Sequence, residues 1–243
     1  MFSYDKIKRL FDFLIASIAF IFSTPFLIVI LILVWNEDKK YPLYASDRVG
    51  KNGRFFKMYK IRTMIYNASI YKINSTSSSD KRITNIGKKL RNYKIDEIPQ
   101  FINIIKGEMS FVGPRPNTFE SGVEFYTNEE LKLLSINPGI TDLSSIVFSD
   151  EAEIISKNNS YNETADDTYN RLIRPWKSKL GIWYVENKSF LLDLILILVT
   201  LGSIFKRKEC LSLLSKILLY FKAPKLLVEF TKRNKSIELY SSQ

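Results

Sequence analysis

Histidine is absent from the 243 residues of the chain, and cysteine occurs only once, at Cys210. The lack of histidine excludes Ser-His and Cys-His nucleophilic machinery, histidine metal ligands and histidine general bases. A single cysteine forms neither an internal disulfide nor a zinc cluster, which is compatible with a reducing cytosolic setting. Any acid–base or nucleophilic chemistry therefore falls to Asp, Glu, Lys, Tyr or Cys210.

Glycine-rich phosphate-binding loops are missing as well, because neither GxxxxGK[ST] nor GxGxxG occurs in the sequence. A nucleotide phosphate would have to be held by arginines, helix ends or a metal. The net charge of +11 nevertheless indicates an anionic partner: nucleic acid, acidic lipid headgroups or a phosphorylated substrate. Composition alone does not choose among these three.

Charge is absent from the 23 residues between Phe13 and Trp35, a run longer than the roughly 18 residues that indicate a membrane helix. No small-residue cleavage site follows, which disfavours a signal peptide. Both flanks are basic, so the positive-inside rule draws both to the cytoplasm.

Pro25 lies in the middle of this run, next to the hydroxyls of Ser23 and Thr24, and predicts a kink there. Each half is then about 12 residues, or roughly 18 Å, too short for a hydrocarbon core of about 30 Å. Residues 1–36 therefore fit a re-entrant helix broken at Ser23 and Pro25, or a single kinked span.

Residues 41–64 predict a β-hairpin around the turn sequence GKNG. Lys60 and Arg62 alternate with apolar neighbours, so they fit one face of a strand or a solvated sheet edge. The polar stretch from Asn74 to Asp80 is typical of a flexible loop.

Asp96 and Glu97 follow a basic stretch that contains Arg91, and they precede an apolar helical pattern that ends at Gly107. Adjacent acids at a helix start are usual, because they cap the helix and favour its dipole, and Asp96 falls near the predicted N-cap. The same pair also offers two carboxylates to a phosphorylated substrate.

Arg115 lies between Pro114 and Pro116, whose restricted backbones present its guanidinium rigidly. A rigid guanidinium suits bidentate phosphate contact. A surface ion pair is the alternative.

Together these stretches resemble the bacterial sugar transferase family, the monotopic phosphoglycosyl transferases. The resemblance rests on KRLFDF with the Ser-Pro break, DRVGKNGRFFKMYKIRTM, RITNIGKKLRNYKIDEIPQFINIIKGEMSFVGPRP, INPGIT and YVENKSFLLDLILILVTL. It covers about residues 6–205, and we expect the small form of the family. The order of these pieces is specific, although no single piece is.

The resemblance implies transfer of a sugar 1-phosphate from a nucleotide sugar, usually UDP-linked, to polyprenyl phosphate, with UMP as the second product. It implies that Asp96 is the nucleophile, which carries a covalent phosphosugar, and that Glu97 serves a Mg²⁺ site. Substrate contacts are expected from five residues: Lys60, Arg62, Arg91, Arg115 and Thr141. The four cations among them also fit structural ion pairs.

The resemblance also implies a mostly α fold with a small β-hairpin, a re-entrant N-terminal helix and amphipathic interfacial helices. We expect a cytoplasmic catalytic domain over residues 37–205, at the inner face of a bacterial membrane. The implied partners are the donor, the polyprenyl phosphate, membrane lipids and, as a possibility, a second copy of the chain. The implied pathway is the first membrane step of a surface glycan such as an exopolysaccharide, lipopolysaccharide or capsule.

Two regions fall outside the pattern. After Thr141 many members continue with Gly-Trp and an Asn-Gly-Arg-like stretch, whereas this chain has DLSSIVFSDEAEI and lacks that arginine. The basic tail, residues 206–243, has leucines at helical spacing and fits an interfacial helix or a helix packed on the protein.

Three other functions compete with this interpretation. A nucleic-acid-binding protein agrees with the charge but not with the membrane segment, and no recognised motif is present. A basic membrane-anchored protein without enzymatic activity is the main alternative. An ordinary glycosyltransferase would release UDP instead of UMP.

Overall fold

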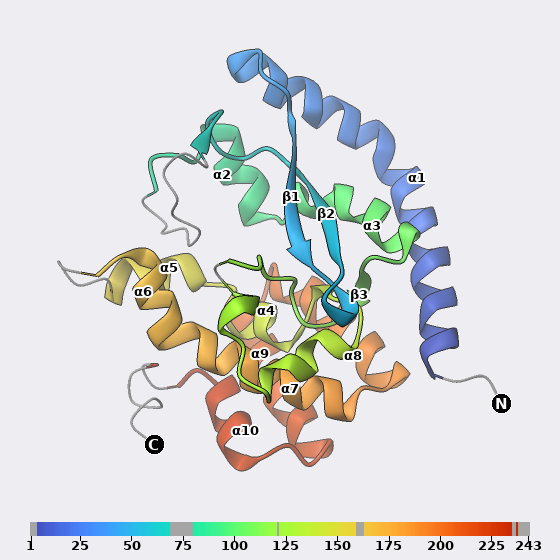
Figure 1. The fold of residues 1–243 in the computed structure, drawn as a ribbon, viewed down its shortest axis with the longest axis vertical. Helices are drawn as coiled ribbons and strands as arrows, with labels where there is room; N and C mark the ends of the chain where they lie inside the picture. Colours follow the sequence, from blue (N-terminus) through green and yellow to red (C-terminus); the bar gives the residue numbers. More distant parts are fainter. Residues whose placement is uncertain (1–3, 69–79, 121, 159–162, 235–236, 238–243) are drawn as a thin grey trace.

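One long helix, α1 (Tyr4–Asp38), runs along the outer edge of the computed structural model, which describes residues 4–68, 80–120, 122–158, 163–234 and 237 (Figure 1). Its buried residues, among them Ala16, Leu27 and Val34, form a narrow stripe against the protein. The rest of its surface exposes large apolar side chains: Leu10, Phe13, Leu14, Ile15, Ile18, Ile21, Phe22, Phe26, Ile28, Val29, Ile32, Leu33 and Trp35. By length and composition α1 is able to cross a membrane.

Pro25 does not end α1, because the helix continues through it to Asp38. Figure 1 shows α1 changing direction near its middle. The hydroxyls of Ser23 and Thr24 donate to the carbonyl of Phe20 at 3.2 and 2.7 Å, which stabilises the turn before the proline. The predicted break is therefore a bend within one continuous helix, and the re-entrant path remains a prediction.

The predicted hairpin is confirmed: β1 (Leu43–Val49) pairs antiparallel with β2 (Phe55–Ile61). The turn at Lys51–Gly53 places Asn52 and Gly53 at positive φ, 56° and 75°, as the sequence GKNG favours. A second, parallel pair, β3 (Ser110–Val112) with β4 (Gly139–Thr141), was not predicted, because three-residue strands carry too little alternation.

The segment between these sheets carries the acid pair. Helix α2 (Asn85–Asn92) is followed by a 3₁₀ helix (Ile95–Gln100) and then by α3 (Phe101–Lys106). Gly107, at φ 82°, ends α3 as predicted. The helix predicted to follow the acid pair is corrected at its start, because the chain enters through 3₁₀ turns and becomes α-helical only at Phe101.

The second half of the chain is helical. Its elements are the 3₁₀ turns Val123–Phe125 and Glu130–Ser135, α4 (Leu143–Val147), α5 (Glu151–Asn158), α6 (Ala165–Thr168), a π turn (Tyr169–Ile173), α7 (Arg174–Asn187), α8 (Phe190–Ser203), α9 (Arg207–Tyr220) and α10 (Lys225–Thr231). The described residues thus form a mostly helical fold, as expected. Asn74–Ser79 and the chain end, residues 238–243, lie outside the described residues.

The C-terminal helices pack on the protein, which is the alternative that the sequence left open. Leu211, Leu214 and Leu218 of α9 and Phe230 of α10 are buried in the main core. The Phe230 ring stacks on Trp176 of α7 with ring centroids 3.8 Å apart. The main core therefore contains residues from both sides of position 206, where the sequence analysis expected a separate tail to begin.

A buried carboxylate fastens the start of α1 to the helical half. Asp193 of α8, only 2% exposed, accepts hydrogen bonds from Tyr4 and Lys8 of α1, both at 2.8 Å, and from Tyr184 of α7 at 2.5 Å. Because Lys8 is itself largely buried, each charge depends on the other for compensation.

Loss of this charge should destabilise the protein. Asp193→Asn leaves the Lys8 ammonium without its counter-ion, so we expect the free energy of unfolding to fall by about 3 kcal/mol. Thermal unfolding of the detergent-purified chain measures this as a lower Tm. Glu153→Gln, which removes an exposed ion pair to Lys157, is the control and should leave the Tm unchanged. Equal Tm values for both variants would show that the buried charge contributes nothing.

Candidate active site

Asp96 and Glu97 lie in the first turn of the 3₁₀ helix. This helix begins directly after Lys94, whose left-handed backbone (φ 55°) separates it from α2. No side chain caps this turn. The capping role that the sequence allowed for Asp96 is therefore not what the structure shows. Both acids are buried, at 7% and 9% exposure, so their charges require compensation.

Glu97 receives that compensation from two cations on different elements. Its Oε1 accepts from Nη2 of Arg115 at 2.5 Å and from Nζ of Lys60 at 3.0 Å, and Oε2 lies 3.4 Å from Nη1 of Arg115. Burial acts to raise the pKa of Glu97, but the charges of Arg115 and Lys60 outweigh it and hold this pKa well below its usual range. Glu97 is thus an ionised carboxylate with both oxygens engaged.

Asp96 has a different environment although it is the next residue. Its Oδ2 lies 3.8 Å from Nζ of Lys60, and among the described contacts it accepts no hydrogen bond. Burial raises the pKa of Asp96; the charge of Lys60 opposes this, while the negative charge of Glu97 adds to it. Asp96 therefore offers carboxylate oxygens that are free of donors, which a nucleophile needs.

Arg91 of α2 lies on the Asp96 side of the pair. Its Nε donates to Thr63 Oγ1 at 2.8 Å, and its positive charge lowers the pKa of Asp96. No ion pair joins Arg91 to Asp96 in the described part of the chain. Arg91 thus contributes to the field around Asp96 without occupying its oxygens.

Arg62 is not brought to the acid pair, and it forms the structural ion pair that the sequence left open as the alternative to substrate contact. Its guanidinium binds both oxygens of Asp38, at 2.7 and 2.6 Å, and the carbonyl of Tyr41 at 2.8 Å. The reason is that β2 ends at Ile61, so the alternation that includes Lys60 stops before Arg62. Arg62 forms a structural ion pair that joins the end of α1 to the hairpin.

The side chain of Thr141 is engaged within the protein, and its expected contact with substrate stays a prediction. The residue is 6% exposed, and its hydroxyl lies 2.7 Å from that of Thr200 in α8. The hydroxyl therefore faces the helical core. The next residue, Asp142, caps α4 and lines the cavity that is described next.

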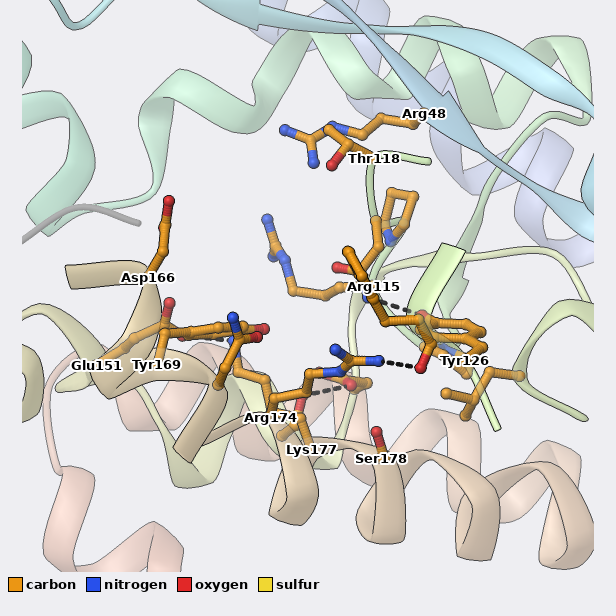
Figure 2. Close-up of a pocket in the computed structure, with 18 of the residues that line it drawn as sticks. Arg48, Arg115, Thr118, Tyr126, Glu151, Asp166, Tyr169, Arg174, Lys177 and Ser178 are labelled. Carbon is orange, nitrogen blue, oxygen red and sulfur yellow. Dashed lines mark hydrogen bonds and ion pairs between the residues drawn. The ribbon is translucent and has the colours of Figure 1, made fainter. Parts of the chain in front are cut away.

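A cavity of about 600 Å³ adjoins the acid pair, and Lys60 and Arg115 line it (Figure 2). Its other lining residues are Arg48, Met58, Pro114, Pro116, Asn117, Thr118, Glu120, Phe125, Tyr126, Leu133, Asp142, Ser144, Ser149, Glu151, Ala152, Asp166, Tyr169, Asn170, Arg174, Lys177 and Ser178. This mixture of cations and aromatic rings suits a ligand that carries both phosphates and a flat ring.

Sequence reasoning missed three cations of this cavity, Arg48, Arg174 and Lys177. The register of the hairpin contained a signal for Arg48, because β1 residues opposite β2 residues share a face. Arg174 and Lys177 carried no comparable signal. The stretch after Thr141, where the sequence differs from the family pattern, contributes Asp142, Ser144 and Glu151 to the lining of the cavity. It contributes no Arg or Lys.

The acid pair fits Mg²⁺ only together with a substrate. No group of three or more His, Cys, Asp or Glu able to hold a metal occurs among the described residues. Mg²⁺ prefers one or two carboxylates plus phosphate oxygens and water, so Asp96 and Glu97 are a suitable partial donor set. Binding through Glu97 would require one of its oxygens to leave Arg115 or Lys60.

Comparison with known proteins identifies a family that matches most of the chain. The bacterial sugar transferase family matches residues 3–207. The chain is 33% identical over 212 residues to "Exopolysaccharide production protein ExoY" of Sinorhizobium fredii, covering 81% of this chain and 84% of that protein.

Two longer proteins are similar as well. The chain is 31% identical to "UDP-N-acetylgalactosamine-undecaprenyl-phosphate N-acetylgalactosaminephosphotransferase" of Aeromonas hydrophila, covering 83% of this chain but 44% of that protein. It is 30% identical to "UDP-glucose:undecaprenyl-phosphate glucose-1-phosphate transferase" of Klebsiella pneumoniae, covering 83% and 41%. The chain thus spans less than half the length of these two relatives.

The structural role of Arg62 is testable. Arg62→Ala removes the bond to Asp38, so we expect the free energy of unfolding to fall by about 1–3 kcal/mol. Thermal unfolding measures this as a lower Tm. Arg54→Ala, which removes an exposed arginine of the same hairpin, is the matched control and should leave the Tm unchanged. An unchanged Tm in Arg62→Ala would show that the ion pair to Asp38 does not stabilise the fold.

Proposed function

The chain belongs to the bacterial sugar transferase family, and we propose that it transfers a sugar 1-phosphate from a UDP-sugar to polyprenyl phosphate at a bacterial membrane. The products are a polyprenyl-diphosphate sugar and UMP. Two of the similar proteins carry names for this type of reaction, each with undecaprenyl phosphate as acceptor.

The single observation that carries the proposal is the contrast between Asp96 and Glu97. The two acids are adjacent and buried, yet Glu97 is engaged by two cations while Asp96 has oxygens without hydrogen-bond donors. The ion pairs of Glu97 account for its burial, whereas Asp96 has one longer ion pair, 3.8 Å to Lys60, and accepts no hydrogen bond among the described residues. A covalent role for Asp96 accounts for carboxylate oxygens that are left without hydrogen-bond donors.

In the first step, a carboxylate oxygen of Asp96 attacks the β-phosphorus of the donor. The bond from that phosphorus to the bridging oxygen breaks, and UMP leaves with the electron pair. A phosphosugar joined to Asp96 through an acyl phosphate remains. Carboxylates are established phosphoryl acceptors in enzymes.

In the second step, an oxygen of polyprenyl phosphate attacks the same phosphorus. The bond to Asp96 breaks, and the carboxylate is regenerated. The sugar phosphate is then joined to the lipid phosphate as a diphosphate, so no phosphate is lost to water.

Both steps bring an anion toward an anion, so positive charge must surround the phosphorus. Lys60 reaches both acids, Arg115 reaches Glu97 from the cavity side, and Arg91 acts from α2. Mg²⁺ held by Asp96, Glu97 and the donor phosphates would supply further charge neutralisation.

The membrane is where the acceptor lies, and α1 supports attachment there. Its apolar face is exposed over most of its length, and its bend at Pro25 fits a helix that enters one leaflet and returns. Both basic flanks then stay in the cytoplasm. On this arrangement the acid pair lies at the cytoplasmic headgroups of the inner membrane, where the acceptor phosphate is.

The covalent step predicts a mass change. The full chain incubated with Mg²⁺ and a panel of UDP-sugars, without lipid acceptor, should gain the mass of one sugar phosphate. Asp96→Asn should gain nothing, because an amide lacks the nucleophilic oxygen, whereas Asp47→Asn, which alters an exposed aspartate of the hairpin, should behave as wild type. Intact-protein mass spectrometry measures the adduct. An adduct of the same size on Asp96→Asn would exclude Asp96 as the nucleophile.

The metal makes a separate prediction. Removal of divalent cations with EDTA should abolish UMP release, and added Mg²⁺ should restore it, because the proposed Mg²⁺ neutralises the charge of the donor phosphates during the attack. Nucleotide chromatography measures the release. Full activity in EDTA would mean that Lys60, Arg91 and Arg115 neutralise the charge without a metal.

A further inference from the structure

Five basic side chains line the cavity beside the acid pair, and four of them have carboxylate partners. The paired cations are Lys60 and Arg115, both with Glu97, Lys177 with Glu151, and Arg174 with Glu130 at 3.8 Å. The fifth, Arg48, has no carboxylate partner among the described residues. Its Nε donates only to the hydroxyl of Ser46, at 3.3 Å.

Arg48 is nevertheless not a solvated surface arginine. Burial is the main cause that lowers the pKa of its guanidinium, and the positive charge of Arg115 adds to this. Figure 2 shows the side chains of Arg48 and Arg115 extending into the same open space from different elements. Two guanidinium groups that face one cavity repel each other unless an anion lies between them.

The hairpin fixes where Arg48 lies. In the β1–β2 register Arg48 is opposite Phe56, Ser46 is opposite Met58, and Tyr44 is opposite Lys60. Opposite residues share a face, so Arg48 is carried on the same face as Lys60, nearer the hairpin turn. Because Phe56 and Met58 are buried in a core cluster with α1 and α3, this face is held in place.

We propose that Arg48 binds the α-phosphate of the nucleotide donor, the phosphate that leaves as UMP. This inference rests on the proposed function and names a further binding residue for it. Lys60 and Arg115 contact the acid pair and so serve the reacting β-phosphate, whereas Arg48 has no such contact and faces Arg115 across the cavity. Its fork of donors suits the two non-bridging oxygens of a phosphate.

Binding of UMP, UDP and uridine by the detergent-purified full chain, measured by calorimetry, tests this inference. Arg48→Ala should weaken binding of both UMP and UDP at least about tenfold, the expected loss of a charge-assisted contact, and leave uridine binding unchanged. Arg48→Lys keeps the charge but not the fork, so it should lie between wild type and Arg48→Ala. Arg54→Ala, the exposed arginine at the hairpin end, is the matched control and should bind all three as wild type.

The outcomes separate this inference from the function on which it rests. Unchanged UMP affinity in Arg48→Ala, with the phosphosugar adduct still formed, would overturn the role of Arg48 and leave the function standing. An equal loss of uridine and UMP, with a lower Tm, would assign Arg48 to the hairpin structure and also overturn it. A wild-type chain that binds no uridine nucleotide and forms no adduct would overturn the proposed function itself.

Discussion

The ion pairs of Glu97 with Arg115 and Lys60 are the contact on which the arrangement of the site depends. They join three segments that are distant in sequence: the hairpin through Lys60, the 3₁₀ helix through Glu97, and the chain after β3 through Arg115. Breaking a buried pair leaves an uncompensated charge and is strongly destabilising, so the pairs favour one relative position of these segments. That position leaves Asp96 buried beside a cavity, with Lys60 at 3.8 Å and no hydrogen-bond donor on its oxygens among the described residues.

The same segments also hold α1. Arg9 of α1 donates to the carbonyls of Ile104 and Ile105 at the end of α3, at 2.6 and 2.8 Å, where a cation also favours the helix dipole. Asp38 at the other end of α1 binds Arg62, directly after β2. Helix α1 is therefore fastened to α3, which directly follows the 3₁₀ helix of Glu97, and to the end of the hairpin strand that carries Lys60.

The closeness of Lys60 and Arg115 to the acid pair was expected from the resemblance to the family. Local patterns in the sequence predicted the hairpin and the end of α3 at Gly107. They failed where a partner distant in the sequence decides the role of a residue. Lys60 and Arg62 look alike in alternation, but only contact with Asp38 shows that Arg62 is structural. The substrate contact of Thr141 was expected from the resemblance alone, and the structure places its hydroxyl against that of Thr200, 59 residues away. Arg48 was missed because the hairpin register that places it on the face of Lys60 was not followed, and its lack of a carboxylate partner among the described residues appears only in the folded chain.

The identity of the released nucleotide tests the account most directly. The donor, polyprenyl phosphate and the full chain are incubated together, and the nucleotide product is separated by chromatography. Attack of Asp96 on the β-phosphorus breaks the diphosphate, so UMP should appear in equal amount with the lipid-linked sugar. UDP in place of UMP would mean that the sugar is transferred without its phosphate, and it would contradict the role assigned to Asp96.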